Sequence, residues 1–345
     1  MPPPPLTRLG FGTSGIMGAA LTTRGRLRLL DIAFDQGIRH FDTAPLYGMG
    51  LAEEVVGRFL RRRRGEITLT TKFGLVPPAI PAPLRPVVPV ARLLHRKLGG
   101  RWATALRAVA LARGVRGGAG NAPPGTPAPE VPSRDSATTV VAPYDPAALR
   151  ASLESSLRKL DTDHIDFFLL HECQPGQLTQ EVIALLEELV AEGKIGRWGL
   201  GSGRRASRAI LGGWPRFKGV AQIPDHLLQR DTRWFADHAA PPLFTHGVLQ
   251  APLRDPACQP TLGALLVRWA ERTGQDASRP GLLGELLLLG GLLNNPSGCV
   301  LFSTGQPERI RDHGRVARQL PRLGPALGEL LAALPSEGEG GQPCL

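Results

Sequence analysis

Short apolar runs alternate along most of this chain with longer stretches of helical periodicity. Eight of the apolar runs have the length and composition of β-strands. They are Leu9–Gly12, Ile38–Thr43, Ile67–Lys72, His164–His171, Gly196–Leu200, Gly219–Ile223, Pro242–Leu249 and Cys299–Phe302. Strands that alternate with helices are typical of a parallel sheet, so the pattern predicts an α/β fold.

The segments between these runs repeat their apolar residues three or four positions apart, which is the period of an amphipathic helix. They are Thr23–Gln36, Leu51–Arg62, Asp145–Leu160, Thr179–Glu192, Ser207–Leu211 and Thr261–Thr273. Asp145 followed by proline is a typical helix start, and Gly37 a typical helix end. The Leu-rich run Gly281–Leu293 is too short to span a membrane and is predicted to be a buried helix. Eight strands followed by helices predict a closed (β/α)8 TIM barrel.

One long segment interrupts this alternation after the third predicted strand. Residues 75–142 are rich in proline and glycine, and no acidic residue occurs between Glu66 and Glu130. Residues 91–116 within this segment combine basic side chains with helical periodicity. The segment is either a poorly ordered surface loop or a basic amphipathic element. Such an element would face a protein partner, a lid or a membrane surface. We expect one barrel domain over residues 1–335, interrupted by this insertion, and a disordered tail over 336–345.

Composition narrows the class of protein only modestly. The 42% hydrophobic and 21% charged residues are ordinary for a globular protein, and the net charge of +11 is concentrated in the insertion. The N-terminus has neither the basic nor the apolar region of a secretory signal, and no run is long enough to span a membrane, so we expect a cytoplasmic protein that binds no nucleic acid. The four cysteines show no metal-ligand or paired spacing and are predicted to be free thiols.

A glycine-rich motif near the N-terminus offers a competing interpretation. Gly10, Gly12 and Gly15 match the G-x-G-x-x-G pattern of dinucleotide-binding Rossmann folds. That fold requires a full strand before the motif and a helix that opens within it. Here the preceding run is short and the helical pattern starts only near Thr23. The motif is therefore weak support for a Rossmann dinucleotide site.

Polar residues at the predicted strand ends carry the candidate chemistry. Asp42 ends the second strand with Tyr47 in the loop beyond, Lys72 ends the third, and His171 ends the fourth. In a TIM barrel these ends lie on the face that holds the active site. A carbonyl that accepts hydride develops negative charge on oxygen and needs a proton donor. A tyrosine could supply that proton if a nearby lysine, kept charged by an aspartate, lowered its pKa, while a histidine donated a hydrogen bond to the substrate.

With these residues in this order, the sequence resembles the aldo-keto reductase superfamily. The string Asp42-Thr-Ala-Pro-Leu-Tyr47-Gly, with Glu53 following, matches the family motif, and Lys72 and His171 complete its catalytic tetrad. The resemblance extends from about Leu9 to His313, excluding the insertion. It implies an NAD(P)-dependent aldo-keto reductase, an alcohol or aldose dehydrogenase, that acts on a small carbonyl or sugar substrate.

The resemblance also implies cofactor-binding positions, some of which depart from the family pattern. Gln222 matches the glutamine that holds the nicotinamide carboxamide, whereas Gly201-Ser202 replaces the usual Ser-Asn pair, so Ser202 is the candidate for the second contact. His246 stands where an aromatic residue usually stacks on the nicotinamide, or else simply lines the barrel rim.

The segment from Val300 to Ile310 resembles the family's adenosine-phosphate site. Ser303, Thr304 and Arg309 are its candidate contacts, although Ser303 replaces an expected lysine. A guanidinium suits a 2′-phosphate, which favours NADP(H) and leaves NAD(H) possible.

Two alternatives remain from other functional classes. A catalytically weak regulatory or scaffold protein could keep the barrel and use the basic insertion to bind a partner. A metal-dependent hydrolase is disfavoured because no second histidine or carboxylate cluster accompanies His171 at ligand spacing.

Overall fold

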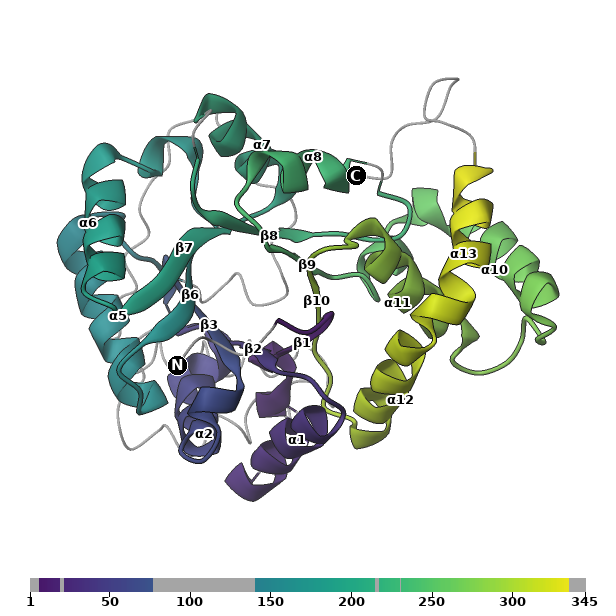
Figure 1. The fold of residues 1–345 in the computed structure, drawn as a ribbon, viewed down its shortest axis with the longest axis horizontal. Coiled ribbons are helices and arrows are strands. Elements are labelled where there is room, and N and C mark those ends of the chain that lie inside the picture. Colours follow the sequence, from purple (N-terminus) through teal and green to yellow (C-terminus); the bar gives the residue numbers. More distant parts are fainter. Residues whose placement is uncertain (1–5, 19–21, 77–139, 215–216, 230, 335–345) are drawn as a thin grey trace, which may run out of the picture.

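The computed structural model describes residues 6–18, 22–76, 140–214, 217–229 and 231–334. Eight parallel strands close into a barrel in the order β1-β10-β9-β8-β7-β6-β3-β2 (Figure 1). Their bounds are β1 Leu9–Gly12, β2 His40–Asp42, β3 Thr68–Phe73, β6 Ile165–His171, β7 Ile195–Gly201, β8 Val220–Pro224, β9 Leu243–His246 and β10 Cys299–Phe302. All eight predicted strands are confirmed. The predicted strand Pro242–Leu249 is shorter in the structure because the chain turns at Gly247, whose φ is 82°.

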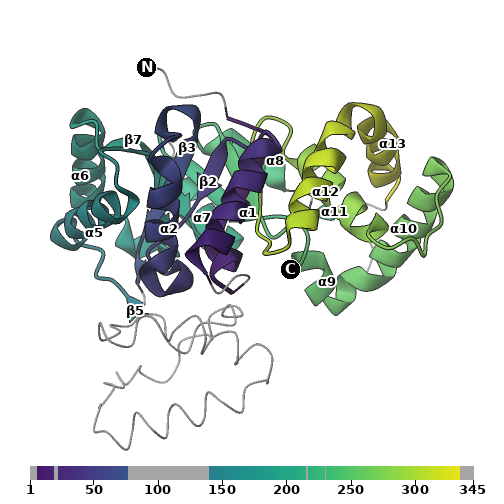
Figure 2. The ribbon, with the colours of Figure 1, turned by 90° about the horizontal axis from the view of Figure 1, so that it is seen from below.

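Helices surround this barrel (Figure 1). The six predicted helices are confirmed with adjusted ends as α1 Thr23–Asp35, α2 Leu51–Leu60, α5 Pro146–Leu160, α6 Gln180–Ala191, α7 Arg204–Gly213 and α10 Gln259–Thr273. Within the described residues the further helices are α8 Thr232–His238, α9 Ala251–Arg254, α11 Leu282–Asn294, α12 Pro307–Arg318 and α13 Leu320–Ala332, of which α11 corresponds to the predicted Leu-rich helix. Asp145 accepts a hydrogen bond from the backbone of Ala148 and caps α5 as its sequence predicts. Helices α10 and α13 lie outside α11 and α12 at one side of the barrel (Figure 2).

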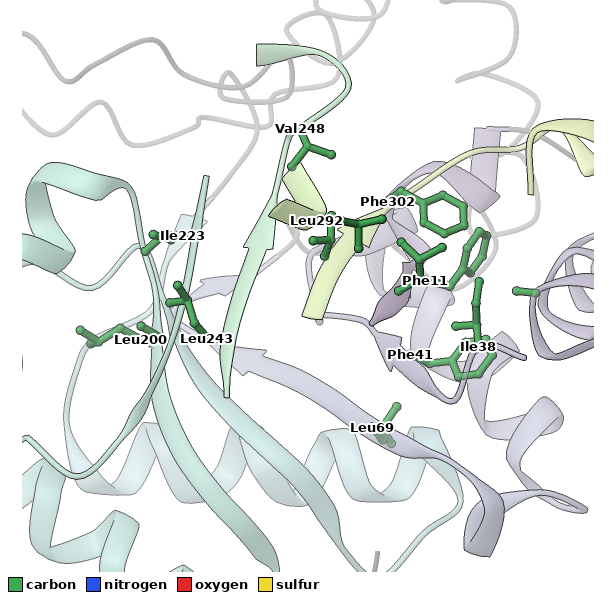
Figure 3. Close-up of a cluster of buried hydrophobic side chains, with 14 of the residues drawn as sticks. Phe11, Ile38, Phe41, Leu69, Leu200, Ile223, Leu243, Val248, Leu292 and Phe302 are labelled. Atoms are coloured by element: carbon green, nitrogen blue, oxygen red, sulfur yellow. The ribbon is translucent and has the colours of Figure 1, made fainter. Parts of the chain in front are cut away.

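The hydrophobic core has two parts because side chains alternate along each strand. Outward-facing side chains such as Phe11, Phe41, Leu69 and Leu200 pack in the layer between barrel and helices (Figure 3). A second cluster of buried side chains consists of Phe167, Leu169, Val220, Phe244, Cys299 and Leu301. Leu287, Leu288 and Leu289 are all buried, which confirms the predicted buried helix at α11.

Alternation also determines where the strand-end polar residues point. On β2, Phe41 belongs to the outer core layer, so its neighbours His40 and Asp42 face the barrel interior. His40 hydrogen-bonds with the hydroxyls of Thr68 (2.9 Å) and Thr70 (3.3 Å), and burial lowers its pKa to about 4. It is a neutral, hydrogen-bonded core histidine, and Asp42 lies one layer nearer the C-terminal face.

The closed barrel excludes the Rossmann interpretation of the glycine motif. Gly10 lies on β1, where a Cβ would come within 2.5 Å of Leu301 and 2.8 Å of His40. The chain continues into a 3-10 helix (η1, Thr13–Gly18) instead of an α-helix. Gly10 is therefore required because any larger residue would collide with side chains of the neighbouring strands β2 and β10.

The insertion begins and ends in the short antiparallel pair β4 Leu75–Val76 and β5 Val140–Val141. The rest of the predicted insertion, including the basic segment 91–116, lies outside the described residues, as does the predicted tail 336–345. Among the residues described, no helix is both long and apolar enough to cross a membrane.

Candidate active site

A buried ion pair lies at the C-terminal end of the barrel. Lys72 Nζ lies 2.7 Å from both carboxylate oxygens of Asp42, and the two side chains are only 2% and 4% exposed. Lys72 Nζ also donates to the backbone oxygen of Thr43 at 3.1 Å. Gln222 Nε2 donates to Asp42 Oδ2 at 2.9 Å, so the carboxylate is bonded from two sides. Ionisable side chains buried this deeply stay ionised only when they are paired and hydrogen-bonded to this degree.

Tyr47 lies next to this ion pair. It begins a 3-10 turn (η2, Tyr47–Gly50), and Lys72 Nζ donates to its hydroxyl at 3.3 Å. Gly48 follows with a φ of 62°, and a Cβ there would come within 2.2 Å of Met17, so the glycine in the motif is a steric requirement. The turn thus aims the half-buried phenol at the lysine.

The charge on Lys72 lowers the pKa of Tyr47, as the sequence predicted, but it does not determine the net shift. Burial raises the pKa of Tyr47 and outweighs the lowering by the Lys72 charge, so the pKa lies above its usual value. Burial opposes the charge on Lys72, but Asp42 and Tyr47 more than compensate and raise the pKa of the ammonium. At neutral pH the site therefore contains a protonated phenol beside a charged lysine.

His171 completes this group at the end of β6. Its ring meets the Tyr47 ring edge to face, with centroids 6.2 Å apart. Burial, Lys72 and His246 lower the pKa of His171 well below its usual value, so the imidazole is neutral. Its buried Nδ1 has no hydrogen-bond partner among the described residues. The structure brings together all four residues that the sequence predicted as a tetrad.

Three predicted cofactor positions surround the tetrad at neighbouring strand ends. Gln222 is buried on β8, and its Oε1 accepts no hydrogen bond from a described residue. Ser202 is also buried, but its hydroxyl donates to the backbone oxygen of Cys173 at 3.2 Å. His246 ends β9, is accessible to solvent, and lies close enough to His171 for its charge to affect the pKa of that residue.

The remaining predicted contacts follow β10. Ser303 Oγ accepts a hydrogen bond from the backbone of Gly15 at 2.9 Å, and Thr304 Oγ1 accepts one from Gln306 at 3.2 Å. Arg309 is exposed in the first turn of α12 and forms no ion pair with any described residue. Only Arg309 of the three has a side chain uncommitted to the protein.

Residues 8–209, more than half of the chain, match the sequence model of the aldo/keto reductase family. The chain belongs to this family. The matched range contains the whole tetrad and Ser202, whereas Gln222, His246, Ser303, Thr304 and Arg309 lie beyond it.

Curated relatives of this family member match it over limited lengths. It is 25% identical over 199 residues to the probable aldo-keto reductase 1 of Glycine max, which covers 56% of this chain and 41% of that protein. It is 41% identical over 69 residues to the D-threo-aldose 1-dehydrogenase of a Pseudomonas species, covering 19% and 21%. The match thus spans less than half the length of these relatives.

Solved structures of other aldo-keto reductases share the barrel over nearly the whole chain. The holo enzyme of Bacillus halodurans gives a TM-score of 0.61 at 20% identity, covering 96% of this chain and 94% of that one. The enzyme of Klebsiella pneumoniae in complex with NADPH gives 0.60 at 22% identity, covering 97% and 94%. These similarities confirm the predicted (β/α)8 fold.

Tyr144 lies beside the tetrad of this aldo-keto reductase, although the sequence did not mark it as a site residue. It lies just after the insertion, and its hydroxyl donates to the backbone oxygen of His171 at 2.6 Å. Its ring packs edge to face against Phe73, with centroids 5.1 Å apart. The one available signal was that the chain has only two tyrosines. Tyr144 is a positioning residue, because it fixes the backbone that carries His171.

We expect Tyr144→Phe to lower the free energy of unfolding by about 1 kcal/mol, because one partly buried hydrogen bond is lost. Turnover should fall less than about tenfold, since His171 remains anchored in β6. Chemical denaturation and steady-state kinetics on the same preparations check this. Unchanged stability would show that the hydrogen bond contributes nothing in solution.

Within the described ranges, no cluster of three or more His, Cys, Asp or Glu side chains could hold a metal ion. Cys173, Cys258 and Cys299 are all buried, and the fourth cysteine, Cys344, lies outside the described residues.

Proposed function

We propose that this protein is an NAD(P)H-dependent oxidoreductase that transfers hydride between nicotinamide and the carbonyl or alcohol carbon of an aldehyde, ketone or sugar. The observation that carries this proposal is the position of Lys72 Nζ, bonded at once to Asp42 and to the Tyr47 hydroxyl beside His171. A phenol held by a buried ammonium is a suitable proton donor for an alkoxide that forms next to it.

Each residue of the tetrad has a distinct task in this mechanism. Tyr47 donates its proton to the substrate oxygen, and Lys72 stabilises the phenolate that remains, because its ammonium already donates to that oxygen. Asp42 keeps Lys72 charged and in place. The neutral imidazole of His171 has one N–H, which orients the substrate oxygen by hydrogen bonding.

The residues around the tetrad fit a nicotinamide cofactor in part. When bound, this cofactor supplies the hydride. Gln222 Oε1 is uncommitted and would accept a hydrogen bond from the carboxamide, whereas Ser202 would have to give up its bond to Cys173 before it could donate one. Arg309, exposed near the N-terminal end of α12, suits a 2′-phosphate. This favours NADP(H), and the related Klebsiella pneumoniae structure holds NADPH.

The names of similar proteins support a polar substrate. They include the D-threo-aldose 1-dehydrogenase of Pseudomonas, the pyridoxal 4-dehydrogenase of Microbacterium luteolum and, by fold, the glycerol dehydrogenase of Gluconobacter oxydans. We therefore infer a small hydroxylated aldehyde or its alcohol as the first substrate class to test.

The decisive experiment is a fluorescence titration of the full chain with NADPH and NADH. It is followed by turnover assays on aldoses, aromatic aldehydes and aliphatic ketones. We expect saturable binding, tighter for NADPH, and turnover of at least one class. Absence of binding to both cofactors would refute the proposal.

The pKa directions at the site predict how the rate depends on pH. Because the pKa of Tyr47 is raised, the phenol stays protonated at neutral pH, and kcat/KM for carbonyl reduction should be flat from about pH 6 to 9 and fall above that range. Alcohol oxidation needs the phenolate, so its rate should rise with pH over the same range. Profiles measured in both directions check this, and a reduction limb that falls near pH 7 would contradict it.

A further inference from the structure

The residue directly after His171 adopts an unusual backbone conformation. Glu172 has a φ of 55°, and among described residues other than glycine only Asp161 also has a positive φ. Asp161 is the C-cap of α5, where this conformation is common. Glu172 has no such role, and a strained residue that persists next to a catalytic group points to a functional constraint.

Hydrogen bonds hold this conformation in place. The Glu172 backbone N–H donates to Gly201 O at 3.0 Å, and its carbonyl accepts from Gln174 Nε2 at 3.1 Å. The carboxylate accepts a long bond of 3.4 Å from the backbone of Gly203, at the start of α7. The side chain is nevertheless exposed and forms no ion pair with a described residue. Glu172 thus presents an unpaired carboxylate between the C-terminal ends of β6 and β7.

The charge of Glu172 acts on the tetrad. It raises the pKa of Tyr47 and also that of Tyr144, although burial is the larger cause in both cases. The other charges close to Tyr47 compensate each other, because Asp42 and Lys72 form a buried pair. His171 is neutral because burial lowers its pKa well below the usual value. Glu172 is therefore the uncompensated charge of the described residues around the proton donor.

We propose that Glu172 selects carbonyl substrates by charge, favouring those with a cationic or hydrogen-bond-donating group near the carbonyl and disfavouring carboxylates. This inference rests on the proposed function. Its physical basis is the Coulomb interaction between Glu172 and a charged substrate. At the rim of a protein, one unit charge a few ångströms from a charged ligand changes the affinity by about tenfold, and salt reduces this effect.

The test uses three para-substituted benzaldehydes that differ in charge: 4-nitro (neutral), 4-carboxy (anionic) and 4-trimethylammonio (cationic). In Glu172→Gln, kcat/KM relative to the nitro compound should rise about tenfold for the anion and fall about tenfold for the cation, and 0.5 M salt should shrink both changes. Glu181→Gln, at an exposed glutamate in the first turn of α6, is the matched control and should alter neither ratio. Unchanged ratios in Glu172→Gln, or equal changes in both variants, would overturn the inference.

A second readout does not depend on turnover. The chain has only two tyrosines, so the alkaline ultraviolet titration of tyrosine can be resolved with Tyr47→Phe as the reference. Glu172→Gln should lower the midpoint for Tyr47. If no carbonyl is turned over by the wild type, the proposed function fails. In that case the titration midpoint alone decides whether the charge of Glu172 affects the pKa of Tyr47. An unchanged midpoint in Glu172→Gln would refute that electrostatic effect.

Discussion

Tyr47→Phe is expected to reduce kcat for carbonyl reduction about 10³-fold, because the variant lacks the proton donor that faces the substrate oxygen. Cofactor affinity should change little, since the hydroxyl bonds only to Lys72 among the described residues. Lys72 keeps its shorter bonds to Asp42 and Thr43, so the fold should remain intact. Single-turnover kinetics with NADPH in excess, combined with cofactor titration, separates these effects.

The other tyrosine provides a matched control for this experiment. Tyr144→Phe removes the same oxygen atom from a ring that lies close to the same histidine. The two variants should differ in kind: Tyr47→Phe loses turnover with little loss of stability, whereas Tyr144→Phe loses stability with little loss of turnover. If Tyr47→Phe retained most of its activity, another group would have to supply the proton, and the mechanism would be wrong.

Lys72→Met is expected to have the largest effect on stability. It leaves the Asp42 carboxylate buried, with Gln222 as its remaining side-chain partner among the described residues. Breaking a buried pair from one side costs about 3–5 kcal/mol, because the remaining charge has lost its compensation. Urea unfolding measures the loss, and activity should fall at least as far as in Tyr47→Phe, since the phenolate is no longer stabilised.

The double variant Asp42→Asn/Lys72→Met separates the two consequences. It removes both charges, so most of the stability lost in Lys72→Met should return. The reason is that an uncompensated buried charge is far more destabilising than a neutral polar group in its place. Activity should not return, since no cation faces Tyr47. A double variant as unstable as Lys72→Met would show that packing around the lysine stem, rather than charge, holds this region together.

Much of the fold was predictable because its signals are local. Each strand is recognisable as a short apolar run, and alternation along β2 and β3 requires Asp42 and Lys72 to face inward while Phe41 faces the helices. Parallel strands bring their C-terminal ends to one face. Residue types at those ends, taken in order, were therefore sufficient to predict which four side chains meet.

The cofactor positions were less predictable from the sequence than the four side chains of the tetrad. Sequence correspondence marks Ser202, Ser303 and Thr304 as candidate contacts, but it cannot show that each is already hydrogen-bonded within the protein. The bond between Gly15 and Ser303 joins segments that are distant in sequence and adjacent because β1 pairs with β10, and Ser202 bonds to Cys173 on a neighbouring loop, whereas Thr304 bonds locally to Gln306. By contrast, Arg309 and the Oε1 of Gln222 make no hydrogen bond with a described residue, which the sequence could not show either.

The sequence by itself thus determined the barrel and which four side chains meet at the C-terminal ends of its strands, because strand periodicity and strand-end position are local properties. Only the tertiary structure decided in which direction the pKa of Tyr47 shifts, because the shift depends on the balance between burial, which raises the pKa, and the Lys72 charge, which lowers it. It also decided that Tyr144 bonds to the backbone of His171, and that Glu172 has a positive φ and no ion pair with a described residue. These properties arise from contacts between remote segments and from the exclusion of water around them, and no run of neighbouring residues encodes either.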